Sequence, residues 1–120
     1  MTEPMTEAAL FELLSLEFRV NSDGTMYYCN TQGQLHRVHG PAIVYSDGGR
    51  EWYQNDRLHR VHGPAVEYSD GRCSWWQDGL PHRLDGPAVE QPDGPCAWFI
   101  NGIELTETEW QRAVASMGVV

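Results

Sequence analysis

Most of the chain alternates between apolar and polar positions over short stretches that turn residues separate. Ala65-Val66-Glu67-Tyr68 is one such stretch; Asp70-Gly71 follows it, and then the aromatic pair Trp75-Trp76. Alternation predicts β-strands, because successive side chains of a strand point to opposite faces of the sheet. Asp-Gly between two strands predicts a tight two-residue hairpin, since glycine adopts positive φ freely and aspartate tolerates it.

The pattern repeats with a period of 23 residues. We name four sequence units: unit 1 (22–45, one residue longer), unit 2 (46–68), unit 3 (69–91) and the partial unit 4 (92–105). Each full unit contains Asp-Gly, an aromatic pair (in unit 1 the second residue of the pair is Cys29), a second polar turn, His-Arg and Gly-Pro-Ala. A hairpin of this size cannot bury a face alone, so stacking of the units into one antiparallel array is expected.

The second turn has the same chemistry in three units. It falls at Asn55-Asp56, Asp78-Gly79 and Asn101-Gly102. These pairs again predict tight turns.

Both ends of the chain change to a helical pattern. Near the N-terminus, four apolar residues share one face at helical spacing: Leu10, Phe11, Leu14 and Phe18. Near the C-terminus, Thr106 followed by Glu109 is a capping-box signature. We therefore predict a mainly β single domain, with β-hairpin repeats over residues 22–105 between an N-terminal helix within 1–21 and a C-terminal capping helix within 106–120.

Charge and cysteine content narrow the function classes. The net charge is -9, and all eight basic residues are arginines. This argues against nucleic-acid binding, which needs many cations for the phosphates, and against binding to acidic membranes. Three cysteines without a paired spacing predict reduced thiols, and the N-terminus lacks the pattern of a signal peptide. A cytoplasmic protein is expected.

The repeat resembles a known family in the run Leu58-His59-Arg60, Gly63-Pro64-Ala65-Val66. This run is similar to the His-Arg-x-Asp-Gly-Pro-Ala repeat proteins of bacteriophages and giant viruses, which are related in pattern to variant MORN repeats. The likeness covers residues 22–105 and implies a β-hairpin array but no particular activity. His39 and His62 depart from the family pattern, in which aspartate is more common and which Asp85 matches.

The histidines suggest two interpretations. His36-x-x-His39 and His59-x-x-His62 have a spacing that allows two imidazoles to share a metal. Unit 3 has Asp85 at the second place, and no cysteine or second carboxylate is fixed beside the pairs. We favour a brace, in which a His or Asp side chain hydrogen-bonds the Gly-Pro turn or pairs with the neighbouring arginine. No metal and no cofactor are predicted.

Stacking of the units would place a second set of residues in register along one rim. These are the candidate anion-binding residues Arg37, Arg60, Arg83, His36, His59 and His82. Such a ladder suits a phosphate, a nucleotide or the carboxylates of a partner. The simpler alternative is that each arginine pairs with acidic residues of adjacent turns.

The aromatic pairs divide between the two faces of a sheet. The first place holds Tyr28, Trp52, Trp75 and Trp98, which we interpret as core. The second place holds Cys29, Tyr53, Trp76 and Phe99 and forms an aromatic stripe that the N-terminal helix, a second copy or a partner must cover. Candidate partner contacts are Tyr53, Trp76, Phe99, Leu16, Glu67 and Glu90, although solvated strand positions are the simpler interpretation for the two glutamates.

No catalytic motif supports an enzyme: the chain has no Gly-x-Ser-x-Gly and no glycine-rich phosphate loop. The leading hypothesis is a non-enzymatic binding protein, a virus- or phage-encoded inhibitor that occludes a host protein such as a defence-system component, in the manner of anti-CRISPR proteins. The alternatives are capture of an anionic small molecule by the Arg/His ladder and a structural role in a virion. A homodimer is also possible, because hairpin arrays leave open sheet edges.

Overall fold

The computed structural model describes residues 4–118, which form two helices and thirteen short strands. The helices are α1 (Glu7–Ser15) and α2 (Glu107–Ser116). The strands in chain order are β1 (Glu17–Val20), β2 (Met26–Cys29), β3 (Ile43–Val44), β4 (Arg50–Glu51), β5 (Tyr53–Gln54), β6 (Arg57–Leu58), β7 (Val66–Glu67), β8 (Cys73–Ser74), β9 (Trp76–Gln77), β10 (Leu80–Pro81), β11 (Val89–Glu90), β12 (Trp98–Ile100) and β13 (Ile103–Leu105). The fold is mainly β, with one helix near each end.

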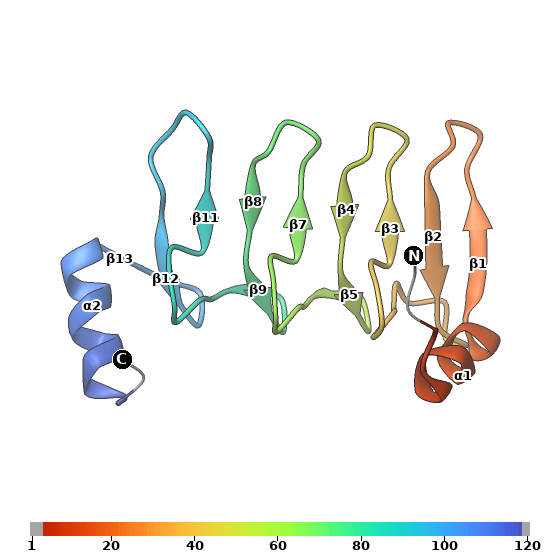
Figure 1. Cartoon of the computed structure of the whole chain (residues 1–120), viewed down its shortest axis with the longest axis horizontal. Helices are drawn as coiled ribbons and strands as arrows, with labels where there is room; N and C mark the ends of the chain where they lie inside the picture. Colours follow the sequence, from red (N-terminus) through yellow and green to blue (C-terminus); the bar gives the residue numbers. More distant parts are fainter. Residues whose placement is uncertain (1–3, 119–120) are drawn as a thin grey trace.

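Seven strands form an antiparallel sheet in the order β1-β2-β3-β4-β7-β8-β11. The other six form three two-stranded antiparallel ribbons, β5-β6, β9-β10 and β12-β13. Figure 1 shows the strands of the sheet side by side, with the ribbons towards their lower ends and the two helices at opposite ends of the row. In the part of the chain that the structure describes, no helix has the length and apolar character needed to cross a membrane.

The hairpin loops at Asp-Gly differ from the prediction. The amide of Gly48 donates to the carbonyl of Tyr45 (3.0 Å), and the amide of Tyr45 donates to the carbonyl of Gly49 (2.8 Å). Gly48 has a φ of 96°, whereas Asp47 is not among the residues with positive φ. Asp47 instead accepts the amide of Gly49 through its side chain (2.8 Å). The loop therefore has three residues, 46–48, and the predicted two-residue hairpin is wrong here.

The second turns form as predicted. Asn55 and Asp56 have φ values of 50° and 67°, and the flanking residues Gln54 and Arg57 pair directly. Two successive residues with positive φ make a type I′ turn, which matches the twist of a two-residue hairpin. Asp56 adopts this conformation in place of the glycine of the other two turns, and its carboxylate accepts the amide of Leu35.

The N-terminal helix is shorter than the predicted range of 1–21. Thr6 caps α1 by accepting the amide of Ala9 (3.1 Å), and the helix ends at Ser15. Phe18 lies in β1 opposite Tyr28 of β2, so it is a strand residue and not part of the helix face. Pairing with β2 satisfies the backbone of residues 17–20, which local periodicity cannot reveal. Residues 1–3 of the predicted range lie outside the described residues.

The C-terminal capping box is confirmed. The hydroxyl of Thr106 accepts the amide of Glu109 (3.1 Å), and the carboxylate of Glu109 accepts the amide of Thr106 (2.8 Å). α2 ends at Ser116, and residues 119–120 of the predicted helix lie outside the described residues. Trp110 and Val114 of α2 are buried against Ile100. α2 therefore covers the ribbon β12-β13.

The buried core beside the sheet is small. Ala42, Ala65 and Ala88 have no exposed surface, and each carbonyl accepts the amide of a first-place aromatic residue (2.7–2.8 Å). Of those aromatic side chains, Trp52 is buried, whereas Tyr28, Trp75 and Trp98 are half-buried. Because the buried core is small, other side chains must cover the remaining faces of these aromatic rings.

Candidate functional site

The arginines of the predicted ladder cover the first-place aromatic rings. Arg60 and Arg83 place Cζ 3.8 Å from the ring centroids of Trp52 and Trp75, and Arg37 does so at 4.3 Å over Tyr28. In each case Nη1 also donates to the carbonyl of the proline that follows, Pro41, Pro64 or Pro87, at 3.0–3.3 Å. A guanidinium stacked on an aromatic face stabilises the fold by cation–π attraction. The ladder is thus part of the architecture of the units.

The glycine of each Gly-Pro turn makes room for the arginine. A Cβ on Gly63 would lie 2.6 Å from Cζ of Arg60, and Gly40 and Gly86 are equally close to their arginines, at 2.8 and 2.7 Å. None of these three glycines has a positive φ. The turn therefore requires glycine for the close approach of the guanidinium.

Two arginines are neutralised within their own unit. Arg83 pairs with Glu90 (2.9 Å) and Asp85 (2.8 Å), and Arg60 lies 3.5 Å from Glu67. Glu67 and Glu90 are thus ion-paired strand residues, more engaged than the solvated positions that we expected. Arg37 differs, because Val44 stands where Glu67 and Glu90 stand in the next units. Within residues 4–118, no ion pair joins Arg37 to a carboxylate.

The first histidine of each motif braces the turn of the following unit. Nδ1 of His36, His59 and His82 accepts the amides of Asn55, Asp78 and Asn101, respectively, at 2.9–3.1 Å. These histidines brace a different place from the one predicted: they act at the second turn of the next unit and not at the Gly-Pro turn. Only Asp85 pairs with its neighbouring arginine in the way we expected. Sequence spacing alone does not reveal these contacts, because they join residues 19 positions apart.

Burial lowers the pKa of His82 below its ordinary value of 6.5. Since Nδ1 must stay unprotonated to accept the amide of Asn101, the unfolded chain binds this proton more readily than the folded chain. We expect the free energy of unfolding to fall as the pH drops from about 7.5 to about 5.5. Urea unfolding across this range should show a smaller decrease for His82→Leu, which imitates Leu105 at the equivalent place, than for wild type. An unchanged slope in His82→Leu would contradict the assignment.

The second histidine of unit 1 lies beside α1. The carboxylate of Glu12 accepts the backbone amides of Val38 (2.7 Å) and His39 (2.9 Å), and Nδ1 of His39 lies 3.4 Å from Glu12 Oε1. Two adjacent amides that hold one carboxylate form a small anion-binding turn. Glu12 is only 11% exposed, so this contact attaches α1 to unit 1.

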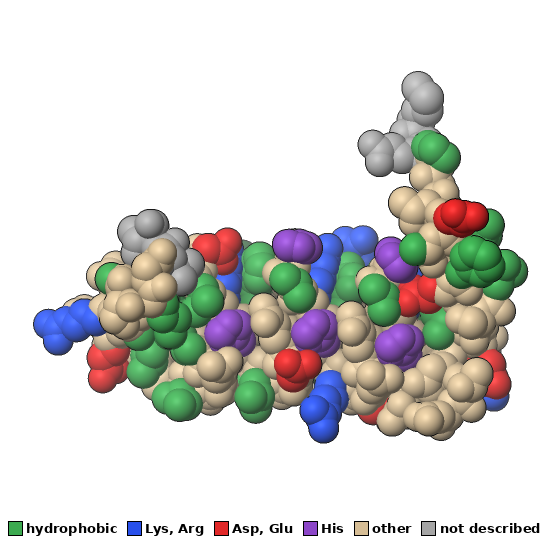
Figure 2. Space-filling view, turned by 90° about the horizontal axis from the view of Figure 1, so that it is seen from below, with side chains coloured by type: hydrophobic (Ala, Val, Ile, Leu, Met, Phe, Trp, Pro, Cys, Tyr) green, Lys and Arg blue, Asp and Glu red, His purple; other side chains and the backbone are tan. Residues whose placement is uncertain are grey.

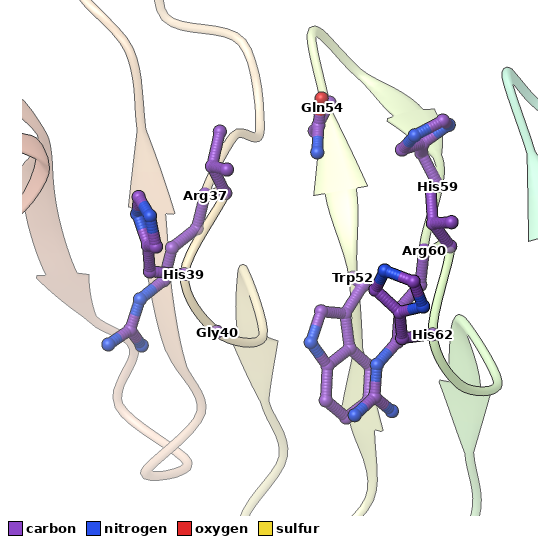
Figure 3. Close-up of a pocket in the computed structure, with 10 residues that line it drawn as sticks. Arg37, His39, Gly40, Trp52, Gln54, His59, Arg60 and His62 are labelled. Atoms are coloured by element: carbon purple, nitrogen blue, oxygen red, sulfur yellow. The ribbon is translucent and has the colours of Figure 1, made fainter. Parts of the chain in front are cut away.

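Two open grooves lie between neighbouring units, on the face where Figure 2 shows a row of histidine side chains between the helices at the two ends. The first, the middle groove, has a volume of about 510 Å³ and is lined by residues 37–40 together with Trp52, Gln54, His59, Arg60, Val61 and His62. Figure 3 shows Arg37 and His39 on one side of it and Trp52, Arg60 and His62 on the other. The second groove, of about 450 Å³, repeats this arrangement one unit further along and contains Asp85 in place of the second histidine.

The second-place aromatic residues are half-buried. Tyr53 donates its hydroxyl to Glu51 (3.1 Å), and the indole of Trp76 donates to Ser74 (2.8 Å). Tyr45 donates to the same carboxylate (3.0 Å), and burial together with Glu51 raises the pKa of Tyr45 to about 12. Phe99 is also half-buried. No hydrogen bond or ion pair joins α1 to this stripe among the described residues.

α1 leaves its apolar face uncovered. Leu10, Phe11 and Leu14 are 49%, 66% and 75% exposed, and we call these three residues the α1 patch. Beside it, β1 is an outer strand of the sheet, and all four of its residues are exposed. Leu16, a predicted partner contact, is half-buried at the end of α1. Three of the four residues of the predicted apolar face lie on α1, and of the three alternatives for covering the aromatic stripe (the N-terminal helix, a second copy or a partner) the structure leaves the apolar face of the helix itself exposed.

The chemistry of the chain offers no assembled metal site: within residues 4–118, no cluster of three or more His, Cys, Asp or Glu side chains is placed to hold a metal ion. Comparison with known proteins gives no further guidance, since no protein-family model, curated protein or solved structure matches this chain.

Proposed function

We propose that this protein is a non-enzymatic binding protein that acts by occupying a surface of another protein. The observation that carries the proposal is the α1 patch. Its three side chains are each about half to three quarters exposed, on a helix with no buried residue. Contiguous exposed apolar surface of this kind is typical of protein interaction sites.

The neighbouring strand supports the same surface as the interface. β1 pairs with β2 on one side, and its other side is the edge of the seven-stranded sheet. Phe18 and Val20 alternate along it and are 52% and 58% exposed. An open edge accepts a further strand from a partner through main-chain hydrogen bonds. A helix face and a strand edge side by side suit a protein partner better than a small molecule.

The charge of the chain indicates the type of partner. A net charge of -9 favours a partner with basic residues around an apolar centre, because complementary charge accelerates association. The finer proposal is a virus- or phage-encoded inhibitor, acting in the host cytoplasm on a defence-system protein. The resemblance to phage and giant-virus repeat proteins and the acidity support this role by analogy.

The proposed architecture is an antiparallel array of stacked β-hairpin repeats of about 23 residues. Equivalent contacts at this spacing support it, notably the three arginine stacks and the three histidine braces. In such an array each unit contacts only its neighbours, so the end units govern stability and offer the free surfaces.

The α1 patch predicts a specific loss of binding. Leu14→Glu places a charge at the most exposed residue of the patch, and we expect it to reduce capture of the partner from host lysate at least about tenfold. Ile103→Glu is the matched control, because Ile103 is 65% exposed but lies in β13 near the other end. Tagged variants are compared by affinity purification with mass spectrometry, and circular dichroism checks that both fold.

Two outcomes would count against the proposal. Equal recovery of the same protein by wild type, Leu14→Glu and Ile103→Glu would exclude the α1 patch as the interface. If wild type recovers nothing and light scattering shows a dimer that Leu14→Glu dissociates, the patch is covered by a second copy and the occlusion of a host protein is wrong.

A further inference from the structure

Four places along the molecule, each able to hold a helix or a ligand, lie against equivalent positions of successive units. The first is next to unit 1 and holds α1, with a hollow of about 620 Å³ remaining between α1 and residues 30–36. The last is next to unit 4 and holds α2, whose Trp110 donates its indole N–H to the carbonyl of Arg83 (2.9 Å). The two grooves between these ends contain nothing from residues 4–118 except their own lining. The chain therefore fills the two end places with its own helices and leaves the two grooves between them open.

The chemistry of each end place matches its occupant. In the last place, Ile100 and Leu105 stand where the middle groove has Gln54 and His59, and the occupant is the apolar face of α2. The first place is polar, with Asn30 and His36 at the same two positions. Its occupant contributes a carboxylate.

The binding of that carboxylate provides a template. Glu12 accepts the amides of Val38 and His39 at 2.7 and 2.9 Å. The equivalent amides in unit 2 are those of Val61 and His62, which line the middle groove. Neither amide donates to an acceptor within the described residues. A carboxylate in the middle groove would find the same pair of donors.

The lining of the middle groove contains two arginines, Arg37 and Arg60, and no Asp or Glu. Glu67, which is outside the lining, lies 3.5 Å from Arg60. Arg37 has no carboxylate partner within residues 4–118, and its Nε is buried without a hydrogen bond. The next groove is less suitable, because Asp85 occupies the position of His62 and both Asp85 and Glu90 neutralise Arg83. A local anion site in a chain of net charge -9 is unexpected and points to a specific role.

We propose that the middle groove binds a carboxylate side chain presented by an acidic helix of another protein, with the amides of Val61 and His62 as its main donors. The helical form of the occupant follows from α1 and α2, which lie at the two equivalent end places. Val61 is 55% exposed and offers an apolar contact beside the donors. This site is separate from the α1 patch and goes beyond the proposed function, so either can fail without the other.

The test is an NMR titration of the full ¹⁵N-labelled chain with a synthetic peptide of residues 4–16, which contains Glu12. We expect saturable shifts of the Val61 and His62 amides, with a dissociation constant on the order of 1 mM because so short a helix is marginal in water. The control peptide carries Glu12→Gln and retains Glu7, and it should shift these amides at least about tenfold less at equal concentration.

Two matched variants localise the effect. His62→Asp copies the lining of the next groove and should weaken peptide binding about tenfold or more, whereas Asp85→His should add shifts at the amides of Leu84 and residue 85. Both positions are exposed, so both variants are expected to fold. Shifts confined to Val38 and His39 would mean that the peptide only exchanges with α1, and this would overturn the proposal. So would equal shifts with the Glu12→Gln peptide, or shifts at Val61 and His62 that appear on concentrating the protein alone, which would identify a second copy as the occupant.

Discussion

Replacing Trp110 by alanine is expected to lower the free energy of unfolding by about 3–5 kcal/mol, which is a large fraction of the stability of a small protein. Trp110 is 9% exposed, packs 4.7 Å from the ring of Trp98 and contacts the buried side chain of Ile100. Its indole also donates to the carbonyl of Arg83, so truncation leaves both a cavity and an unpaired acceptor. Urea unfolding measures the loss, and thermal unfolding should fall by roughly 10–20 °C.

Trp110→Phe is the matched control for this prediction. It keeps an aromatic ring against Trp98 but loses the N–H, so we expect a smaller loss of about 1–2 kcal/mol. Hydrogen exchange should quicken first in β12 and β13 in the alanine variant, because Trp110 packs against Trp98 and Ile100 of β12. A loss below about 1 kcal/mol for alanine would show that α2 does not close this end of the protein.

Local turn and cap chemistry explains why part of the fold is predictable. Asn55-Asp56 and Thr106 act through their own backbone and the next few residues, so their geometry follows from the sequence around them. The Asp47-Gly48 loop shows the limit of this approach. The side chain of Asp47 accepts the amide of Gly49 and so caps a three-residue loop. Whether the loop has two or three residues depends on the strand register.

Long-range contacts explain what sequence patterns miss. The face of Leu10, Phe11 and Leu14 continues to Phe18 at helical spacing, but the pairing of residues 17–20 with β2 ends the helix. The alternation in 17–20 before Asp23-Gly24 is the available signal, since these residues hold the same place as the strand before Asp70-Gly71, although Arg19 and Val20 reverse the polarity of Val66 and Glu67. Helix and strand patterns overlap in so short a segment.

The candidate site was only partly predictable for a similar reason. Periodicity places His36, His59 and His82 in register, but their partners lie in the following unit. The open amides of Val61 and His62 have no sequence signal of their own, because every residue other than proline carries a backbone N–H. Their significance depends on Glu12, which binds the equivalent turn from another part of the chain.

The arginine stacks lead to the second large effect, which is expected at Trp52. Trp52→Ala removes a ring that is 8% exposed and that Arg60 covers at 3.8 Å and Arg50 approaches at 5.6 Å. We expect a loss of about 3–5 kcal/mol in urea unfolding, since the change creates a cavity beneath a guanidinium that Gly63 and Pro64 hold in place. The position is central, so the loss affects contacts with the units on both sides.

Unit 1 supplies the matched control for this change. Tyr28 holds Arg37 at 4.3 Å in the same arrangement, so Trp52→Tyr should retain the stack and cost only about 1 kcal/mol. A double-mutant cycle of Trp52→Ala with Arg60→Met separates the stack from simple burial, and a coupling energy of about 1–2 kcal/mol is expected. If the coupling is near zero, burial alone stabilises the ring. The arginines would then be available to bind a ligand, and the stacked geometry would no longer argue against an anion-binding role of the ladder.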